Sequence, residues 1–291
     1  MPPSANPASV APVAVKAALH AAQAAGLDRL DAQMLLLHAL GRPTGERAWL
    51  MSHDGDLLTD RQAAAFQSAL SRRQQGEPLA YIVGRKEFFG LNLQVDARVL
   101  VPRPDTETLV QWALDVLSQS GAAGAVSVLD LGTGSGAIAL AVHAQQQAGA
   151  PVHMTAVDAS ADALVVAQQN AVNLGLDVQF VHSNWFEKVS GHFHLILSNP
   201  PYVADDDSHL AALRHEPLQA LTSGRDGLDD LRRIVDDAPA HLHPGGWLLL
   251  EHGYDQPAAV RDLLTRRGFT CVESRHDLAG IGRCSGGQWP G

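Results

Sequence analysis

The apolar run that begins at Phe193 ends in the sequence Asn199-Pro200-Pro201-Tyr202. Each proline removes a backbone N–H donor and fixes one φ angle, and Pro200 also restricts Asn199 to an extended conformation. The result is a stiff corner that holds an amide side chain, free carbonyl groups and an aromatic ring in fixed positions. This combination predicts a site that grips a polar group of a ligand.

A second candidate site is the sequence VLDLGTGSGAIAL, in which a hydrophobic strand runs into a glycine-rich loop and then a helix. Glycines allow the tight turn and let a ligand approach bare backbone. The pattern alone leaves three interpretations open, which are S-adenosylmethionine binding, dinucleotide binding and purely structural glycines. The loop residues that would contact a cofactor are Gly132, Thr133, Gly134, Ser135 and Gly136.

Two further positions follow the next strands along the chain. Asp158 ends the strand after the glycine loop, where a carboxylate can accept hydrogen bonds from both hydroxyls of a ribose. The alternative is that Asp158 or Ser160 only caps the following helix. Trp185 lies where its flat ring could cover an adenine and Asn184 could read the adenine edge, although a single tryptophan after a strand is often part of the core.

These candidate residues fall at strand ends in a region of alternating strands and helices. From Asp105 onward, apolar strand patterns alternate with amphipathic helix patterns. Such alternation predicts a Rossmann-like, doubly wound parallel sheet with helices on both faces, in which ligands bind at the carboxyl ends of the strands. Two consecutive late strands, at 269–277 and 280–285, predict an antiparallel pair at one edge.

The preceding residues divide into three segments with different patterns. Residues 1–12 are expected to be a disordered leader. Residues 13–76 predict a small all-α domain, in which Thr59 and Gln62 form a capping-box pattern. Residues 77–104 alternate apolar and polar residues around Gly90, which predicts a β-hairpin linker. The catalytic domain is then expected to cover residues 105–291.

The composition restricts the class of protein. The net charge is −10 with only 21 lysines and arginines, which disfavours a protein that mainly grips nucleic-acid phosphates. The two cysteines, Cys271 and Cys284, form no CxxC pair, so a reducing cytoplasmic location is expected and no metal site is predicted. The apolar runs are too short to span a bilayer.

The Asn-Pro-Pro-Tyr corner after a DLGTGSG loop resembles class I S-adenosylmethionine methyltransferases that act on exocyclic or amide nitrogens. The segments EPLAYIVGRKEFFGLNLQVDARVLVPRPDTETLV, EPLQALTSGRDGLDDLRRIV and GGWLLLEHGYDQ narrow the resemblance. Together they are similar to the release-factor glutamine N5-methyltransferases, the HemK or PrmC family. The resemblance extends over nearly the whole chain from about residue 30 and includes the helical N-terminal domain.

The resemblance implies methyl transfer from S-adenosylmethionine to the glutamine of a Gly-Gly-Gln motif in class I peptide chain release factors. It assigns the catalytic role of binding and orienting the substrate amide to Asn199, Pro200, Pro201 and Tyr202, with Tyr202 packed against that amide. Cofactor contacts fall to the loop 132–136, Asp158, Trp185 and Asn199, and the helical domain is the expected second contact with the release factor. The alternatives are glutamine methylation of a ribosomal protein, amino-group methylation of a nucleic acid, and a non-enzymatic binding protein.

Two features of the chain stand apart from this pattern. The family usually has an aspartate where this chain has Asn184, and an amide there keeps hydrogen-bonding capacity but lacks the charge. The chain also carries its own Gly286-Gly287-Gln288. This is interpreted as a coincidence in a loose tail, with transient occupation of the active site, or methylation in cis, as the alternative.

Overall fold

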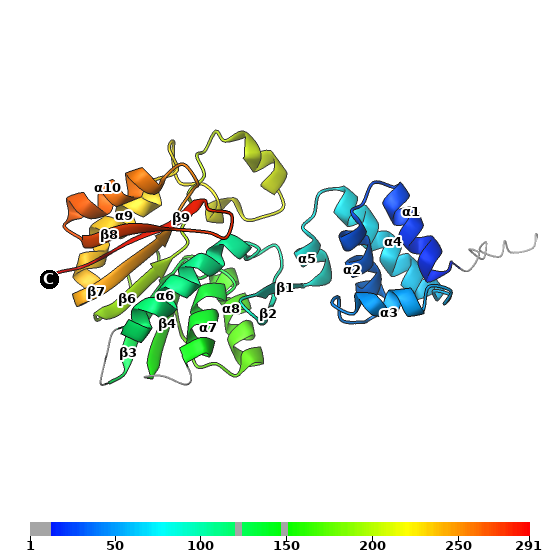
Figure 1. Ribbon diagram of the computed structural model, residues 1–291, viewed down its shortest axis with the longest axis horizontal. Helices are drawn as coiled ribbons and strands as arrows, with labels where there is room; N and C mark the ends of the chain where they lie inside the picture. Colours follow the sequence, from blue (N-terminus) through cyan, green and yellow to red (C-terminus); the bar gives the residue numbers. More distant parts are fainter. Residues whose placement is uncertain (1–12, 120–123, 147–150) are drawn as a thin grey trace, which may run out of the picture. The chain divides into compact units, whose positions relative to one another are not determined.

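A computed structural model describes residues 13–119, 124–146 and 151–291, so the predicted leader 1–12 lies outside the described residues. The chain divides into two compact units, Met1–Gly84 and Arg85–Gly291 (Figure 1). The candidate site residues all belong to the second unit.

The first unit is helical. Asp28 caps one of its helices by accepting a hydrogen bond from Leu30, and the predicted capping box of Thr59 and Gln62 is present. A core that includes Leu35, Leu36 and Phe66 holds the helices together. The helices are α1 (Val15–Ala24), α2 (Arg29–Ala39), α3 (Arg47–Ser52), α4 (Asp60–Gln74) and α5 (Leu79–Val83).

The segment predicted as a hairpin linker over 77–104 begins differently in the structure. Its first part forms α5, which ends at Gly84 in a left-handed conformation, and Ile82 and Val83 pack into the helical core. A short run that is apolar on all sides does not distinguish a helix from a strand, and this run is a helix. The hairpin is confined to β1 (Arg85–Phe88) and β2 (Leu91–Gln94), with its turn at Gly90 as expected.

The second unit is built on a seven-stranded sheet in the order β5-β4-β3-β6-β7-β9-β8. The first five strands in this order are parallel, and β9 pairs antiparallel with both β7 and β8. The predicted doubly wound sheet is therefore confirmed. The strands are β3 (Val126–Leu131), β4 (Val152–Asp158), β5 (Gln179–His182), β6 (Phe193–Ser198), β7 (Leu242–Glu251), β8 (Thr270–His276) and β9 (Gly282–Gln288).

Alternate residues along each strand face opposite sides of the sheet, and each side is covered by helices (Figure 1). Val128 and Leu195 belong to the core cluster beneath α6 (Glu107–Gln119), α7 (Ala137–Gln145) and α8 (Ala161–Leu174). Leu129 and Ile196 belong to the cluster beneath α9 (Asp229–Asp237) and α10 (Pro257–Arg267). Strand β3 lies between β4 and β6, so the strand order reverses there and opens a crevice at the carboxyl ends.

The Gly286-Gly287-Gln288 sequence does not lie in a loose tail, which corrects the interpretation made from the sequence. It forms the end of β9, paired on both sides by β7 and β8. Both glycines are buried, and the Gln288 side chain donates to the Gly245 carbonyl at 2.9 Å. A β-carbon on Gly286 would lie 2.5 Å from Leu249 Cδ2. The glycine is therefore required by packing, and this segment is not free to enter the active site.

Replacing Gly286 with alanine is expected to destabilise the protein. The new methyl group would also lie 2.7 Å from the Leu248 carbonyl oxygen, which the backbone of β7 cannot move without disturbing the sheet. Overpacking of this kind costs roughly 1–3 kcal/mol, so we expect a drop of several degrees in Tm. Thermal denaturation measures it, with Gly124→Ala as the control because a β-carbon there meets nothing within 4 Å. Equal Tm values for the two variants would contradict the prediction.

Candidate active site

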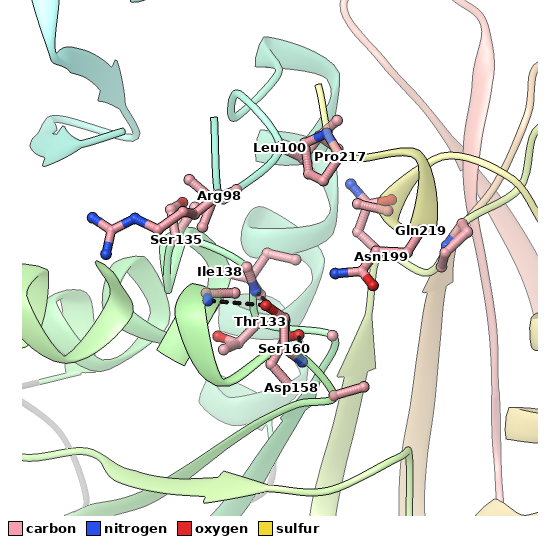
Figure 2. Close-up of a pocket in the computed structure, with 18 of the residues that line it drawn as sticks. Arg98, Leu100, Thr133, Ser135, Ile138, Asp158, Ser160, Asn199, Pro217 and Gln219 are labelled. Carbon is pink, nitrogen blue, oxygen red and sulfur yellow. Dashed lines mark hydrogen bonds between the residues drawn. The ribbon is translucent and has the colours of Figure 1, made fainter. Parts of the chain in front are cut away.

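A pocket lies at the carboxyl ends of β3, β4 and β6, where the sequence predicted ligand binding (Figure 2). Its walls come from four loops after strands and from the segment that precedes α6. The lining residues include Arg98–Arg103, Thr106, Gly132–Ser135, Asp158–Ser160, Ser183–Trp185, Asn199, Pro201, Pro217, Gln219, Ala220 and Asp230.

The glycine loop after β3 forms one wall of the pocket, and Gly134 and Gly136 serve different purposes in it. Gly132, Gly134 and Gly136 all have positive φ angles, of 70°, 55° and 83°. A β-carbon on Gly136 would lie 2.9 Å from Leu140 Cδ1, so this glycine lets α7 pack closely. A β-carbon on Gly134 meets nothing within 4 Å, because this residue borders the pocket. The loop thus presents bare backbone to a ligand.

The two hydroxyl residues of the loop are buried. Thr133 Oγ1 donates to Asp130 Oδ2 at 2.6 Å, and the Ser135 carbonyl accepts from Asn170 Nδ2 at 2.9 Å. Thr133 and Ser135 are only 5% and 3% exposed, so their hydrogen bonds hold the loop in place. Both residues also border the pocket.

Of the two roles that the sequence left open here, the structure shows the helix cap, which Ser160 provides, whereas contact of Asp158 with a ribose stays a prediction. Ser160 caps α8, since its hydroxyl accepts from the Ala163 N–H at 3.2 Å. Asp158 accepts from the backbone N–H groups of Gly134 and Ser160, each at 2.8 Å, and so ties the glycine loop to β4 (Figure 2). Burial raises the pKa of this carboxyl group, and the two backbone hydrogen bonds oppose the shift. Each carboxylate oxygen has a second lone pair with which to accept from a ligand.

Trp185 and Asn184 both border the pocket, in different settings. Trp185 has a φ of 50°, its ring lies against Gly132, and its Nε1 donates to Asp230 Oδ1 at 3.1 Å. The amide of Asn184 is exposed and donates to Glu187 Oε1 at 2.7 Å. Contact of these residues with an adenine stays a prediction.

The proline corner contributes to the pocket from the end of β6. Asn199 and Pro201 line the pocket, and Asn199 Nδ2 donates to Thr106 Oγ1 at 3.2 Å. Pro200 is buried, and the Tyr202 hydroxyl donates to Glu251 Oε1 at 3.3 Å. The predicted contact of Tyr202 with a substrate amide stays a prediction.

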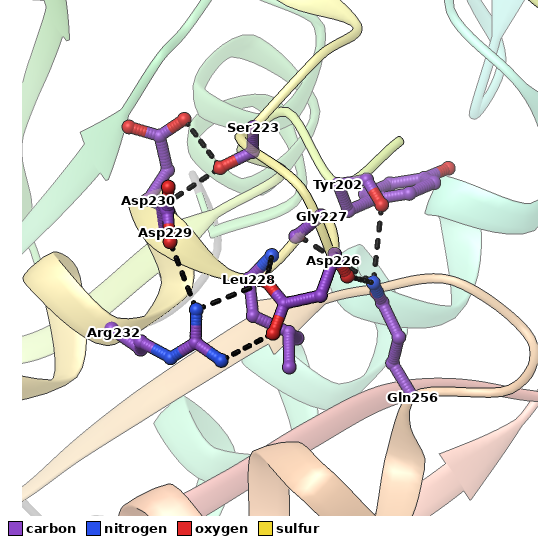
Figure 3. Close-up of polar contacts among 9 residues, drawn as sticks. All are labelled: Tyr202, Ser223, Asp226, Gly227, Leu228, Asp229, Asp230, Arg232 and Gln256. Carbon is purple, nitrogen blue, oxygen red and sulfur yellow. Dashed lines mark hydrogen bonds and ion pairs between the residues drawn. The ribbon is translucent and has the colours of Figure 1, made fainter. Parts of the chain in front are cut away.

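A polar network braces the chain that follows this corner (Figure 3). Gln256 Nε2 donates to the Tyr202 carbonyl at 3.1 Å, and Ser223 Oγ donates to Asp230 Oδ2 at 2.8 Å. Arg232 pairs with both Asp226 and Asp229 at the start of α9. Because Asp230 also accepts from Trp185, the network connects the proline corner with the loop after β5.

Sequence reasoning gave no role to four residues that shape this pocket. Thr106 and Glu251 contact the proline corner, as described above. Glu216 is buried, accepts from the Val101 N–H at 3.1 Å and forms an ion pair with Arg103, which holds the pocket wall 98–103 in place. All four residues lie in segments that carried the family resemblance. For Glu251, an acidic residue at the end of an apolar strand was a further signal.

Asp130, which supports the glycine loop, predicts a pH dependence of stability. The residue is fully buried, and burial raises the pKa of its carboxyl group to about 7. The folded state therefore favours the protonated form, so this group lowers stability as pH rises from about 4 through about 7. Asp130→Asn removes the charge, and we expect it to raise the unfolding free energy by roughly 1–4 kcal/mol at about pH 8 and little at about pH 4.

Urea denaturation of both proteins at the two pH values measures this difference. The control is Asp162→Ala, an exposed acidic position in the first turn of α8. An Asp130→Asn effect that is the same at both pH values would contradict the prediction.

The described residues contain neither a helix that could span a membrane nor a cluster of side chains that could bind a metal ion. Within residues 13–119, 124–146 and 151–291, no helix has the length and apolar character needed to cross a membrane. The same residues hold no group of three or more histidine, cysteine, aspartate or glutamate side chains arranged to bind a metal ion.

Comparison with known families matches both units of the chain. Residues 109–266 match the family described as Methyltransferase small domain, and residues 14–84 match the PrmC N-terminal domain. A relative from Bordetella pertussis named release factor glutamine methyltransferase is 48% identical over 90% of this chain and 95% of its own. A relative of the same name from Xylella fastidiosa is 46% identical over 94% of this chain and 98% of its own.

Solved structures are similar in fold at low sequence identity. A methyltransferase from Pyrococcus furiosus has a TM-score of 0.51 at 18% identity and covers 77% of this chain and 99% of its own. The T. Thermophilus 16S rRNA N2 G1207 methyltransferase, in complex with AdoMet and guanosine, has a TM-score of 0.51 at 20% identity, covering 70% of this chain and 49% of its own. These similarities establish the fold class.

Proposed function

This chain belongs to the release factor glutamine methyltransferase family, and on that basis we propose that it methylates N5 of the glutamine in the Gly-Gly-Gln motif of class I peptide chain release factors. The observation that carries the proposal is the Asn199 amide, which borders the pocket with its Nδ2 already donating to Thr106. Its Oδ1 is thereby the end left to accept a hydrogen bond from a substrate.

The pocket suits S-adenosylmethionine, which when bound supplies an electrophilic methyl group on its sulfonium. The open backbone at Gly134 allows close approach of a ligand, and Asp158 offers a carboxylate for ribose hydroxyls one strand away. Trp185 adds a flat ring to the same wall. These residues are the proposed cofactor contacts, together with Thr133, Ser135 and Asn199.

The residues of the proline corner address the main difficulty of methylating an amide. The nitrogen lone pair of an amide is delocalised into its carbonyl group, so the nitrogen is a poor nucleophile. Asn199 Oδ1 and the Pro200 carbonyl are the proposed acceptors for the two substrate N–H bonds, and the fixed prolines keep them aimed. As the nitrogen becomes cationic, two nearby oxygens stabilise the transition state more than the ground state. The proton then leaves to water.

A labelled-methyl transfer assay with release factor, ribosomal proteins, RNA and DNA as separate acceptors tests the proposed function. We expect the label on the release factor alone, and mass spectrometry of its peptides should locate it on the glutamine of Gly-Gly-Gln. Label on a ribosomal protein or a nucleic acid instead would refute the assignment and support the corresponding alternative.

The helical unit is the proposed second contact with the release factor. If it contributes to binding, the whole factor should have a lower KM than a short peptide that contains only its Gly-Gly-Gln segment. The same assay provides this comparison, and equal KM values for the two acceptors would remove the helical unit from substrate recognition.

A further inference from the structure

A buried glutamine anchors the backbone of the proline corner (Figure 3). The side chain of Gln256 is 8% exposed, and its Nε2 donates to the Tyr202 carbonyl at 3.1 Å and to the Asp226 carbonyl at 3.3 Å. We propose that Gln256 is a positioning residue for methyl transfer, which holds Asn199 and the Pro200 carbonyl where they meet the substrate amide. The inference rests on the proposed function, because it concerns the same site.

The prolines of the corner create the need for such an anchor. Pro200 and Pro201 fix two φ angles, but neither has an N–H group with which to bond to its surroundings. Among the backbone hydrogen bonds of the described residues, the first after the two prolines is the one that the Tyr202 carbonyl accepts from Gln256. The Tyr202 carbonyl is therefore the point at which the backbone of the corner is joined to the rest of the unit.

Gln256 is itself fixed in both position and orientation. It is the N-cap residue of α10, and its backbone N–H donates to the Gly253 carbonyl while its carbonyl accepts from the Val260 N–H, each at 3.0 Å. Val260 and Leu264 bury this helix against the sheet. The Gly253 N–H, which can only donate, bonds to Gln256 Oε1 at 2.8 Å. Nε2 must therefore face the carbonyl groups.

The backbone at Gly227 encloses the same carbonyl group from another direction. Gly227 has a φ of 72°, and a β-carbon there would lie 2.2 Å from the Tyr202 carbonyl oxygen and 2.9 Å from Gln256 Nε2. Only glycine lets the chain pass this close to the hydrogen bond. Gly227 and Gln256 are both buried, so we expect the Tyr202 carbonyl to be left without a partner, and the corner to shift, when the glutamine donor is removed.

The same amide also joins the two ends of the segment 203–226, which follows the corner. Tyr202 precedes this segment and Asp226 ends it, and Gln256 Nε2 donates to the carbonyl groups of both residues. The residues of this segment that line the pocket are Pro217, Gln219 and Ala220. One side chain therefore holds the corner and this part of the pocket wall in a single arrangement.

Gln256→Glu tests the inference, because it keeps the shape of the side chain and its Oε1 acceptor but removes the Nε2 donor. With saturating cofactor and release factor, we expect kcat to fall about tenfold or more, since a small displacement of positioning groups has an effect of this size. The Kd for S-adenosylmethionine should stay within about threefold, because none of the hydrogen bonds of the described residues joins Gln256 to the loop 132–136 or to Asp158. A short Gly-Gly-Gln peptide should show the same fold loss in kcat, because the effect arises at the corner itself.

Gln256→Met is the second variant, since it removes the donor without burying a charge. The matched control is Gln288→Glu, which also removes an Nε2 donor to a backbone carbonyl, that of Gly245, and lies outside the residues that line the pocket. The Tm of each variant is measured, and kcat is determined well below the lowest Tm. We expect the control to keep the kcat of the unaltered protein.

Two results would overturn the inference. One is a folded Gln256 variant that keeps the kcat of the unaltered protein, and the other is an equal loss of kcat in Gln288→Glu, which would make the effect a general loss of stability. If the unaltered protein transfers no methyl group to a release factor, the proposed function itself fails.

Discussion

Replacing Asn199 with alanine is expected to lower kcat about 10- to 100-fold, while the Kd for S-adenosylmethionine changes much less. The variant removes the acceptor for one substrate N–H bond and leaves that donor buried without a partner, which costs roughly 1–3 kcal/mol. Steady-state transfer of a labelled methyl group to release factor measures kcat, and calorimetric titration measures the Kd.

The matched control for this variant is Asn173→Ala. Asn173 is an exposed amide on α8 that accepts a hydrogen bond from Gln169, and it lies outside the residues that line the pocket. We expect its kcat to equal that of the unaltered protein. Undiminished turnover in Asn199→Ala would exclude the acceptor role and with it the proposed grip on the amide.

Replacing Asp158 with alanine should weaken S-adenosylmethionine binding by roughly 100-fold. Two effects combine, because the variant removes the proposed acceptor for the ribose and also releases the Gly134 N–H that Asp158 holds. Each hydrogen bond to a charged group contributes roughly 1.5–3 kcal/mol, and every 1.4 kcal/mol is about tenfold in Kd.

Calorimetric titration of the cofactor into Asp158→Ala and into Asp162→Ala tests this expectation. Asp162 lies four residues further on, is exposed, and does not line the pocket, so its removal should leave the Kd unchanged. A Kd for Asp158→Ala that matches the control would show that Asp158 serves only to anchor local backbone.

The main features of the second unit could be predicted from local sequence patterns. Alternation of strands and helices indicated the parallel sheet, and the glycine loop, Asp158 and Asn199 were all expected at the carboxyl ends of strands. The structure brings them to one pocket. Local pattern was sufficient here because the direction of parallel strands determines where each strand ends.

Other features depend on partners that lie far away in the sequence. Thr106 is 93 residues from Asn199, and Glu251 is 49 residues from Tyr202, so no local pattern reveals either contact. The same reason explains the misjudged position of Gly286 and Gly287. Their burial depends on β9 lying between β7 and β8, and strand order is a property of the whole sheet rather than of the segment.

The pairing of β3 with β6 has a consequence for the folding of this protein. Ser198 bonds to Leu131 across 67 residues of chain, and these two strands carry the glycine loop and the proline corner at their ends. Closing a segment of this length lowers chain entropy before any contact compensates for it, which makes such pairings slow steps. Folding intermediates that lack this pairing cannot carry out methyl transfer. The methyl-transfer activity recovered during refolding therefore measures the fraction of chains in which β3 and β6 have paired.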